Sequence, residues 1–314
     1  MIQAQPAHAP VMRDEMLHYL VPRADGVYVD GTFGRGGYAR AILAHKPRRL
    51  FAFDRDHDAI AAGQELARQY PALTLIHGRF GAMAELLAAR DVHKVDGIAL
   101  DLGVSSPQLD EAGRGFSFRA DGPLDMRMDQ TGDVSAADLV NGCTETDLAK
   151  IILDFGDERY ARRIARAVIA ARAAAPITRT LQLAEIVRRI VPRSKDGIDP
   201  ATRTFQALRI VVNDEFGELN AGLRAAEALL HPQGRLVVVS FHALEDRIVK
   251  EFLRARDGKS GRGSRHLPAN DTAPARFREL TRRPVMPGTD EITANPRARS
   301  ARLRAAERLA PEAA

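Results

Sequence analysis

Residues 27–38, VYVDGTFGRGGY, constrain the fold of this chain more than any other stretch. Residues 27–29 are β-branched or aromatic and predict a short buried strand that ends at Asp30. Four glycines occur in the turn that follows, and the small apolar residues of 39–44 then predict a helix. A strand, a glycine-rich turn and a helix in this order open a doubly wound α/β domain. A tight glycine turn without a ligand is the alternative.

The spacing of the glycines narrows the choice of ligand. The turn has Asp30 in front of it and does not follow the Gly-x-Gly-x-x-Gly pattern of dinucleotide sites. A carboxylate beside a compact turn suits a cofactor whose end is cationic and small. S-adenosylmethionine carries an ammonium, a sulfonium and a carboxylate there and has no pyrophosphate. The helix N-terminus offers N–H groups to the cofactor carboxylate.

Composition excludes several classes of protein. The chain has 314 residues, of which 45% are hydrophobic, so one large or two ordinary domains can form. Cys143 is the single cysteine, which excludes an internal disulfide, disfavours a cysteine-based metal site and fits a reducing cytoplasm. No apolar run approaches the ~20 residues that span a bilayer. A net charge of +5 permits nucleic-acid binding without establishing it.

The second predicted strand, residues 49–53, is followed by Asp54. Asp54 lies twenty residues after Gly34, at the end of the second strand. An acidic residue in this position of a doubly wound fold accepts hydrogen bonds from a ribose diol. The alternative is that Asp54 caps the helix predicted after it, although Asp56 is the better candidate for that cap.

Two further strand ends are predicted to meet the same crevice. Phe80 follows a strand at 73–77 and could stack on an adenine or fill the core. Asp101 ends a strand at 95–101. Ligands of open α/β sheets bind outside the carboxyl ends of the strands, so Asp30, Asp54, Phe80 and Asp101 are expected to converge.

An inserted domain is expected between the fourth and fifth strands. The fifth strand, 234–241, lies much further from Asp101 than a usual crossover allows. Helical periodicity in the intervening segment predicts a mainly helical substrate-recognition domain at 111–204, with 1–110 and 205–314 forming the core. A helix beginning near residue 200 is expected to return the chain to the core. Surface arginines of the insert, including Arg159, Arg162, Arg163 and Arg166, either contact substrate or form a solvated face.

The C-terminal part is basic. Residues 254–308 contain fourteen Lys or Arg against six Asp or Glu, with a Gly-rich basic stretch at 259–265. Residues 296–304 predict a last, exposed strand, and a basic tail beside the crevice suits phosphate contacts. His242 follows the fifth strand and either borders the crevice or caps the next helix.

Taken together, these segments resemble the bacterial 16S ribosomal RNA (cytosine-N4)-methyltransferase family over nearly the whole chain. Long strings of residues carry the resemblance: HAPVM at 8–12, DGTFGRGG at 30–37, FDRD at 53–56, DLGVSSPQL at 101–109, RGFSF at 114–118, GPLDMRM at 122–128, TRTFQ at 202–206, SFH at 240–242, LEDR at 244–247 and NPRARS at 295–300. Two positions depart from the family, since Tyr38 stands where His is common and Ala243 where Ser is common.

The resemblance implies a Rossmann-like class I methyltransferase core with an inserted helical domain. It implies methyl transfer from S-adenosylmethionine to the exocyclic N4 of a cytidine in the decoding region of 16S rRNA, with no metal. Asp101 is the candidate proton acceptor, or it serves the cofactor only. The cofactor contacts implied by the resemblance are Gly36, Gly37, Tyr38, Asp54, Phe80, Asp101 and Gln108.

The expected partner is 16S rRNA in the assembled small ribosomal subunit, in the cytoplasm, and a homodimer is compatible with the resemblance. Three other functions are alternatives. A class I methyltransferase for DNA or another RNA base is opposed by the long strings. A nicotinamide-dependent oxidoreductase is opposed by the glycine spacing. An RNA-binding assembly factor without catalysis is opposed by the intact acids at the strand ends.

Overall fold

A computed structural model of the chain describes residues 10–193, 197–258 and 274–310. The chain divides into two compact units, of which the first combines Met1–Gly103 with Gly217–Ala314 and the second is Val104–Phe216. His8 and the basic stretch at 259–265 lie outside the described residues. None of the helices in the described ranges has the length and apolarity needed to cross a membrane.

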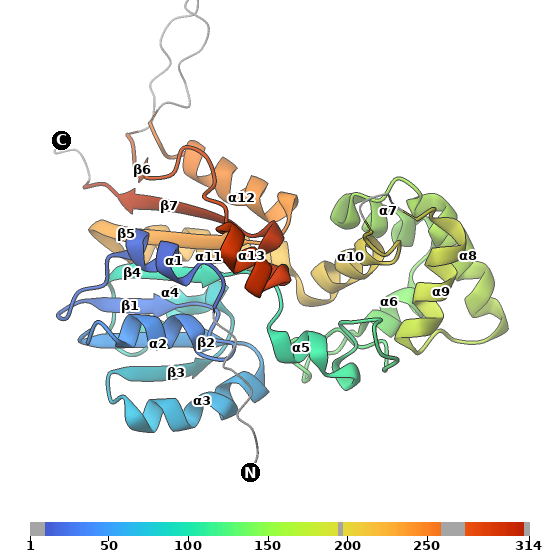
Figure 1. Ribbon diagram of the computed structural model, residues 1–314, viewed down its shortest axis with the longest axis horizontal. Helices are drawn as coiled ribbons and strands as arrows, with labels where there is room; N and C mark the ends of the chain where they lie inside the picture. The colour runs from blue at the N-terminus through green and yellow to red at the C-terminus, as the bar shows by residue number, and fades with distance from the viewer. Residues whose placement is uncertain (1–9, 194–196, 259–273, 311–314) are drawn as a thin grey trace, which may run out of the picture. The chain divides into compact units, whose positions relative to one another are not determined.

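The first unit is built on one seven-stranded sheet in the order β3-β2-β1-β4-β5-β7-β6 (Figure 1). β1 pairs in parallel with β2 and β4, and the outer neighbours β3 and β5 continue the parallel arrangement. This topology confirms the predicted doubly wound, Rossmann-like α/β core. The strands are β1 (Val27–Asp30), β2 (Arg49–Asp54), β3 (Leu73–His77), β4 (Val95–Asp101), β5 (Leu230–Ser240), β6 (Phe277–Glu279) and β7 (Arg302–Arg308).

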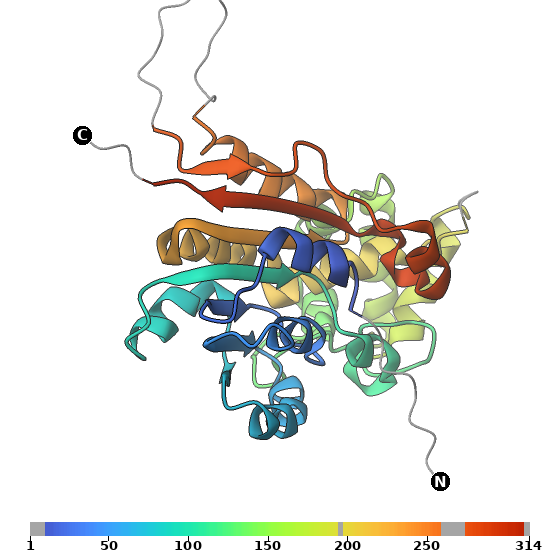
Figure 2. The same cartoon turned by 60° about the vertical axis from the view of Figure 1, so that its left-hand side comes forward.

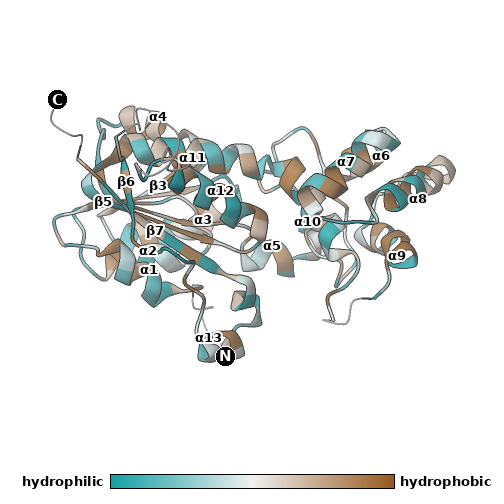
Figure 3. Ribbon diagram, turned by 90° about the horizontal axis from the view of Figure 1, so that it is seen from above, coloured by the Kyte–Doolittle hydropathy of each residue, from teal (hydrophilic) through white to brown (hydrophobic). Residues whose placement is uncertain are grey.

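Helices cover both faces of this sheet because successive strand residues point to opposite faces. Val27 and Val29 belong to one apolar cluster, whereas Tyr28 between them belongs to another. The strands are hydrophobic between helices with polar outer faces (Figure 3). The Tyr28 side is covered by α1 (Arg13–Leu20), α2 (Gly37–Leu43) and α3 (His57–Gln69), and the Val27 side by α4 (Met83–Ala88), α11 (Glu215–Leu229) and α12 (Ala243–Arg254).

The prediction of an exposed last strand was wrong. Residues 296–300 form a 3₁₀ helix, η3 (Pro296–Ser300), after α13 (Thr289–Ala294), and β7 begins only at Arg302. β7 pairs antiparallel with both β5 and β6, so it is an inner strand whose central residues are buried (Figure 2). β6, which the sequence pattern did not reveal, is the edge strand. β5 also differs from prediction, since it starts at Leu230 and not at residue 234.

The second unit is helical and has its own core. Thr144 caps α7, because its hydroxyl oxygen accepts a hydrogen bond from the Asp147 N–H at 3.1 Å. The return helix was placed wrongly. Phe205 and Leu208 of α10 are buried in this unit's core, so the unit extends to Phe216 and the 111–204 boundaries were too narrow. The helices are α5 (Ser106–Asp110), α6 (Ala136–Gly142), α7 (Glu145–Gly156), α8 (Ala161–Ala174), α9 (Thr180–Ile190) and α10 (Thr202–Asn213), with η2 (Ala112–Arg114) between α5 and α6.

Candidate active site

The turn after β1 is tied to the end of β4 by backbone and side-chain hydrogen bonds. The Gly31 N–H donates to the Ala99 carbonyl at 2.9 Å. The Asp101 N–H donates to Oγ1 of Thr32 at 2.7 Å. These bonds hold Asp30 and Asp101 at the carboxyl ends of neighbouring strands, which is where the sequence placed them. Thr32 had not been singled out, although it stands inside the glycine turn.

Asp54 ties the same turn to the end of β2. Its Oδ2 accepts from the Gly34 N–H at 2.7 Å, and its Oδ1 accepts from the Asp56 N–H at 2.9 Å. Asp56 caps α3, since its carboxylate accepts from the Asp58 N–H at 3.0 Å, which confirms the assignment of the cap. A carboxylate has about four lone-pair positions, so Asp54 retains capacity for ribose hydroxyls. The ribose contact stays a prediction.

The glycines at the start of α2 bring bare backbone to the turn. Gly36 caps the helix with φ of 74°, and a Cβ there would lie 2.9 Å from the Phe33 ring. A Cβ on Gly37 would lie 2.7 Å from Cβ of Pro10. Both positions therefore require glycine, and the Gly36 N–H donates to the Phe33 carbonyl at 2.6 Å.

The Tyr38 side chain is buried near the acids of the strand ends, since burial and the charges of Asp101 and Asp30 raise the pKa of its hydroxyl. The residue is buried, and its hydroxyl donates to the Val11 carbonyl at 2.7 Å. The Tyr38 ring lies in the core between the sheet and α1. The hydroxyl proton is thus already engaged, and the cofactor contact that the resemblance implies for residue 38 stays a prediction.

The carboxyl groups of Asp30 and Asp101 have raised pKa values. Burial, with a smaller contribution from the Asp54 charge, raises the pKa of Asp30 to about 7, although the N–H groups of Thr32 and Ala39 lower it. Burial also raises the pKa of Asp101 well above its usual value, with Asp30, Glu245 and Glu291 adding to the effect. Asp101 keeps some exposed surface as a residue, but its Oδ1 is buried.

One oxygen of each carboxyl is available for a ligand. Oδ2 of Asp30 and Oδ1 of Asp101 are buried and have no hydrogen-bond partner among the described residues. Unsatisfied buried acceptors are costly, and a cationic donor is the partner that relieves that cost. These atoms therefore fit the ammonium end of S-adenosylmethionine.

We expect the cofactor-free protein to lose stability as the pH rises from about 4 to 7. The unfolded Asp30 has a pKa of 3.8, and the folded value is about 7. Because the folded state binds the Asp30 proton more tightly than the unfolded state, protonated Asp30 favours folding. This stabilisation is fully present below the unfolded pKa and is lost as the pH rises through 7. At 1.36 kcal/mol per pKa unit, it amounts to a few kcal/mol.

The measurement is thermal unfolding of the wild type and Asp30→Asn between pH 4 and 8.5. The asparagine keeps an acceptor for the Thr32 N–H and removes the titration. The variant is expected to show a flatter pH profile, whereas Asp25→Asn, at an exposed position, should follow the wild type. Parallel profiles for the wild type and Asp30→Asn would contradict the assignment.

Two other predicted residues have defined places. Phe80 is half-buried in η1 (Phe80–Ala82), just past the end of β3. Gln108 belongs to the second unit, where its Oε1 accepts from the Ser105 N–H at 3.0 Å and closes a capping box on α5. The predicted cofactor contact of Gln108 stays a prediction.

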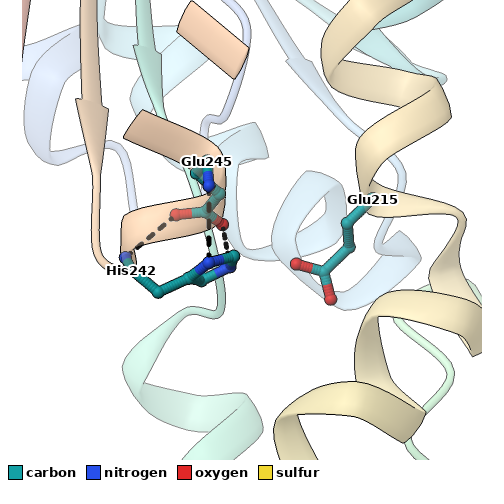
Figure 4. Close-up of side chains that lie close together, drawn as sticks. All are labelled: Glu215, His242 and Glu245. Carbon is teal, nitrogen blue, oxygen red and sulfur yellow. Dashed lines mark hydrogen bonds and ion pairs between the residues drawn. The ribbon is translucent and has the colours of Figure 1, made fainter. Parts of the chain in front are cut away.

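His242 is the N-cap of α12, which supports the capping interpretation. Its Nδ1 accepts from the Glu245 N–H at 3.4 Å, and its Nε2 lies 2.9 Å from Oε1 of Glu245 (Figure 4). The Glu245 Oε2 accepts from the Phe241 N–H at 2.9 Å. Glu215, also drawn, belongs to the second unit, where Nε of Arg209 donates to it at 2.7 Å.

The fold and the acids at its strand ends together define a protein of the methyltransferase class. The chain belongs to the MraW methylase family, which matches residues 5–309. This membership removes the nicotinamide-dependent oxidoreductase from consideration.

Relatives with known names agree with this assignment. The chain is 59% identical to the ribosomal RNA small subunit methyltransferase H of Rhodospirillum centenum, over 99% of this chain and 95% of that protein. It is 57% identical to the protein of the same name from Paramagnetospirillum magneticum, over 98% and 97%. A crystal structure of an rRNA methylase from Streptococcus thermophilus aligns with 99% of this chain and 100% of its own, at 10% identity and a TM-score of 0.42. The likeness to that structure is too distant to bear on function.

Proposed function

We propose that this protein transfers a methyl group from S-adenosylmethionine to the exocyclic N4 of a cytidine in the decoding region of 16S rRNA. The observation that carries the proposal is the pair of buried carboxyl oxygens of Asp30 and Asp101 at adjoining strand ends, which have no hydrogen-bond partner within the part of the chain that the structure describes. The small-subunit RNA substrate is supported by the names of the relatives. The cytidine N4 and the decoding region rest on the resemblance of the sequence.

The residues of the first unit have separate tasks in binding the cofactor. The backbone at Gly36, Gly37 and Tyr38 receives its carboxylate, Asp54 accepts from its ribose, and Phe80 lies against its adenine. S-adenosylmethionine supplies an electrophilic methyl group on sulfur. The protein contributes mainly by holding the acceptor nitrogen in line with that methyl group.

Proton removal is the second task. The cytosine amine is a weak nucleophile because its lone pair is delocalised into the ring, so its proton must leave as the bond forms. Asp101 is the candidate acceptor, and a raised pKa makes a carboxylate a stronger base. The alternative within this proposal is that Asp101 holds only the cofactor ammonium.

RNA binding is assigned to arginines whose guanidinium groups are exposed. The target base must be unpaired or flipped out of its stack, so the protein has to hold the flanking backbone. Arg159 and Arg163 are exposed and lie 5.1 and 5.7 Å from the ring centre of Tyr160, at the start of α8. Arg166 on the same helix lies 3.4 Å from Oε1 of Glu145.

Two arginines of the basic C-terminal part are engaged with a carboxylate. Arg304 is 6% exposed and is paired with Asp246, and Arg302 lies 3.7 Å from the same carboxylate. Arg304 therefore stabilises the sheet and is not accessible to phosphate. We therefore place the phosphate contacts on the helical insert, which is our proposed substrate-recognition domain.

RNA affinity is expected to fall with salt, with a log–log slope of roughly −0.7 per phosphate contacted on single strands. Arg159→Ala with Arg163→Ala should weaken binding and reduce the slope by about 1.4, because two contacts are lost. Arg166→Ala is the matched control, since its guanidinium is already close to a carboxylate. Filter binding of decoding-region RNA across salt concentrations measures the slope, and equal slopes for all variants would exclude this surface.

The function itself is tested by incubating the protein with labelled S-adenosylmethionine and small ribosomal subunits that lack the modification. Nucleoside analysis of the product is expected to show N4-methylated cytidine. Label in a different nucleoside or in DNA would favour the rival methyltransferase. Cofactor binding without any transfer would favour the assembly factor.

A further inference from the structure

The segment that carries Phe80 is anchored to α11 by a buried carboxylate. Glu218 of α11 is 6% exposed, and its Oε1 accepts from the Gly81 N–H at 2.8 Å. Gly81 packs closely on the same helix, since a Cβ added there would lie 2.9 Å from Oε2 of Glu218 and 3.0 Å from Cβ of Ala221. The backbone directly after Phe80 is therefore held at a single point on α11.

The ring of Phe80 rests on the next turn of the same helix. Gly222 lies four residues after Glu218 and so projects from the same face of α11. A Cβ on Gly222 would lie 2.4 Å from both Cδ2 and Cε2 of Phe80. Side-chain atoms cannot approach that closely, so the observed position of the ring requires glycine at 222.

The other side of Phe80 faces the glycine turn. A Cβ on Gly31 would lie 3.2 Å from Cβ of Phe80 and 2.3 Å from Cδ2 of Leu100. Phe80 thus stands between the turn after β1 and helix α11, with glycine on both sides. Two glycines and one buried carboxylate leave the side chain little freedom to move.

We infer that Glu218 and Gly222 are positioning residues that set Phe80 for the adenine of the cofactor. The inference rests on the proposed function, because it requires Phe80 to face the cofactor. Neither residue contacts the reacting atoms. Each acts through Phe80, Glu218 by fixing the backbone and Gly222 by making room for the ring.

A double-mutant cycle tests the role of Gly222. The dissociation constant of S-adenosylhomocysteine is measured by calorimetry on the full chain for the wild type, Gly222→Ala, Phe80→Ala and the double variant. Gly222→Ala should raise the dissociation constant about 3- to 10-fold, which corresponds to the free energy of one aromatic contact. In the Phe80→Ala background it should have no further effect, because the ring that it would displace is absent.

Glu218 is tested by a conservative and a disruptive variant. Glu218→Gln retains an oxygen acceptor for the Gly81 N–H and should bind close to wild type, whereas Glu218→Leu should lose affinity. Glu227→Leu is the control on the same helix, because Glu227 is 9% exposed and pairs with Arg256 and Arg276. It should lower the melting temperature and leave the dissociation constant unchanged.

The outcomes separate this inference from the proposed function. If Gly222→Ala binds S-adenosylhomocysteine as tightly as the wild type does, Gly222 does not position Phe80 for the cofactor. An effect of Gly222→Ala that persists in full without the Phe80 ring would exclude the same role, since it would not act through that ring. A wild type that binds no ligand would overturn the proposed function, and this inference with it.

Discussion

Asp101→Asn is expected to lower the rate of methyl transfer at saturating cofactor by about 10²- to 10⁴-fold, the range for a general base. The asparagine has nearly the same shape and cannot accept a proton. The fold should not suffer, because Asp101 sits with its Oδ1 buried and its pKa raised, so the ionised form is the costly one. Its backbone N–H bond to Thr32 is retained.

Transfer and cofactor binding must be measured separately on this variant. Single-turnover transfer at saturating cofactor reports the chemistry, and calorimetry reports the binding. A loss of affinity that is fully recovered at high cofactor concentration would make Asp101 a cofactor ligand only. Unchanged transfer at all concentrations would remove Asp101 from the mechanism.

Arg304→Ala is expected to destabilise the first unit by about 3 kcal/mol or more. Arg304 lies in the inner strand β7 and is 6% exposed. Its Nε donates to Oδ1 of Asp246 at 2.6 Å and its Nη2 to Oδ2 at 3.1 Å. Removing the guanidinium leaves the carboxylate of Asp246, a residue that is 8% exposed, buried without its main partner.

Denaturant unfolding measures this loss, and two variants serve as controls. Arg302→Ala should cost under about 1 kcal/mol, because Arg302 is 35% exposed at its side chain and lies 3.7 Å from Asp246. Arg304→Met combined with Asp246→Leu should recover much of the loss, since no buried charge is left unpaired. A small effect of Arg304→Ala alone would show that Arg302 suffices to pair the carboxylate.

The ends of the parallel strands could be predicted because their signals are local. Residues 27–30 and 98–101 are each an apolar run closed by an acid, and parallel strands bring such ends to one edge. The burial of β7 could not be predicted in this way. Glu307 is 6% exposed because Arg235 and Arg278 pair with it at 2.9 and 2.6 Å, and both partners are distant in sequence. Without its partners, the strand reads as a charged surface segment.

Within the candidate site, the residues that could be predicted from sequence are those whose side-chain chemistry indicates a role. Asp30, Asp54 and Asp101 are acids at strand ends. Glu218 and Gly222 belong to an ordinary helical pattern, and their relation to Phe80 is visible only once α11 is packed. The contact of the Tyr38 side chain could not be predicted, because nothing in the sequence indicates that its hydroxyl donates to the Val11 carbonyl.

The position of β7 also bears on how the chain folds during synthesis. The second unit is a continuous stretch, Val104–Phe216, so all of its residues have left the ribosome while the last strands are still untranslated. β6 precedes β7 in the chain but joins the sheet only through it. The sheet therefore cannot be completed until residues 302–308 emerge, and the helical unit has time to fold first. Until then β5 has one unpaired edge. The incomplete sheet can therefore pair with a strand of another chain at this stage of synthesis.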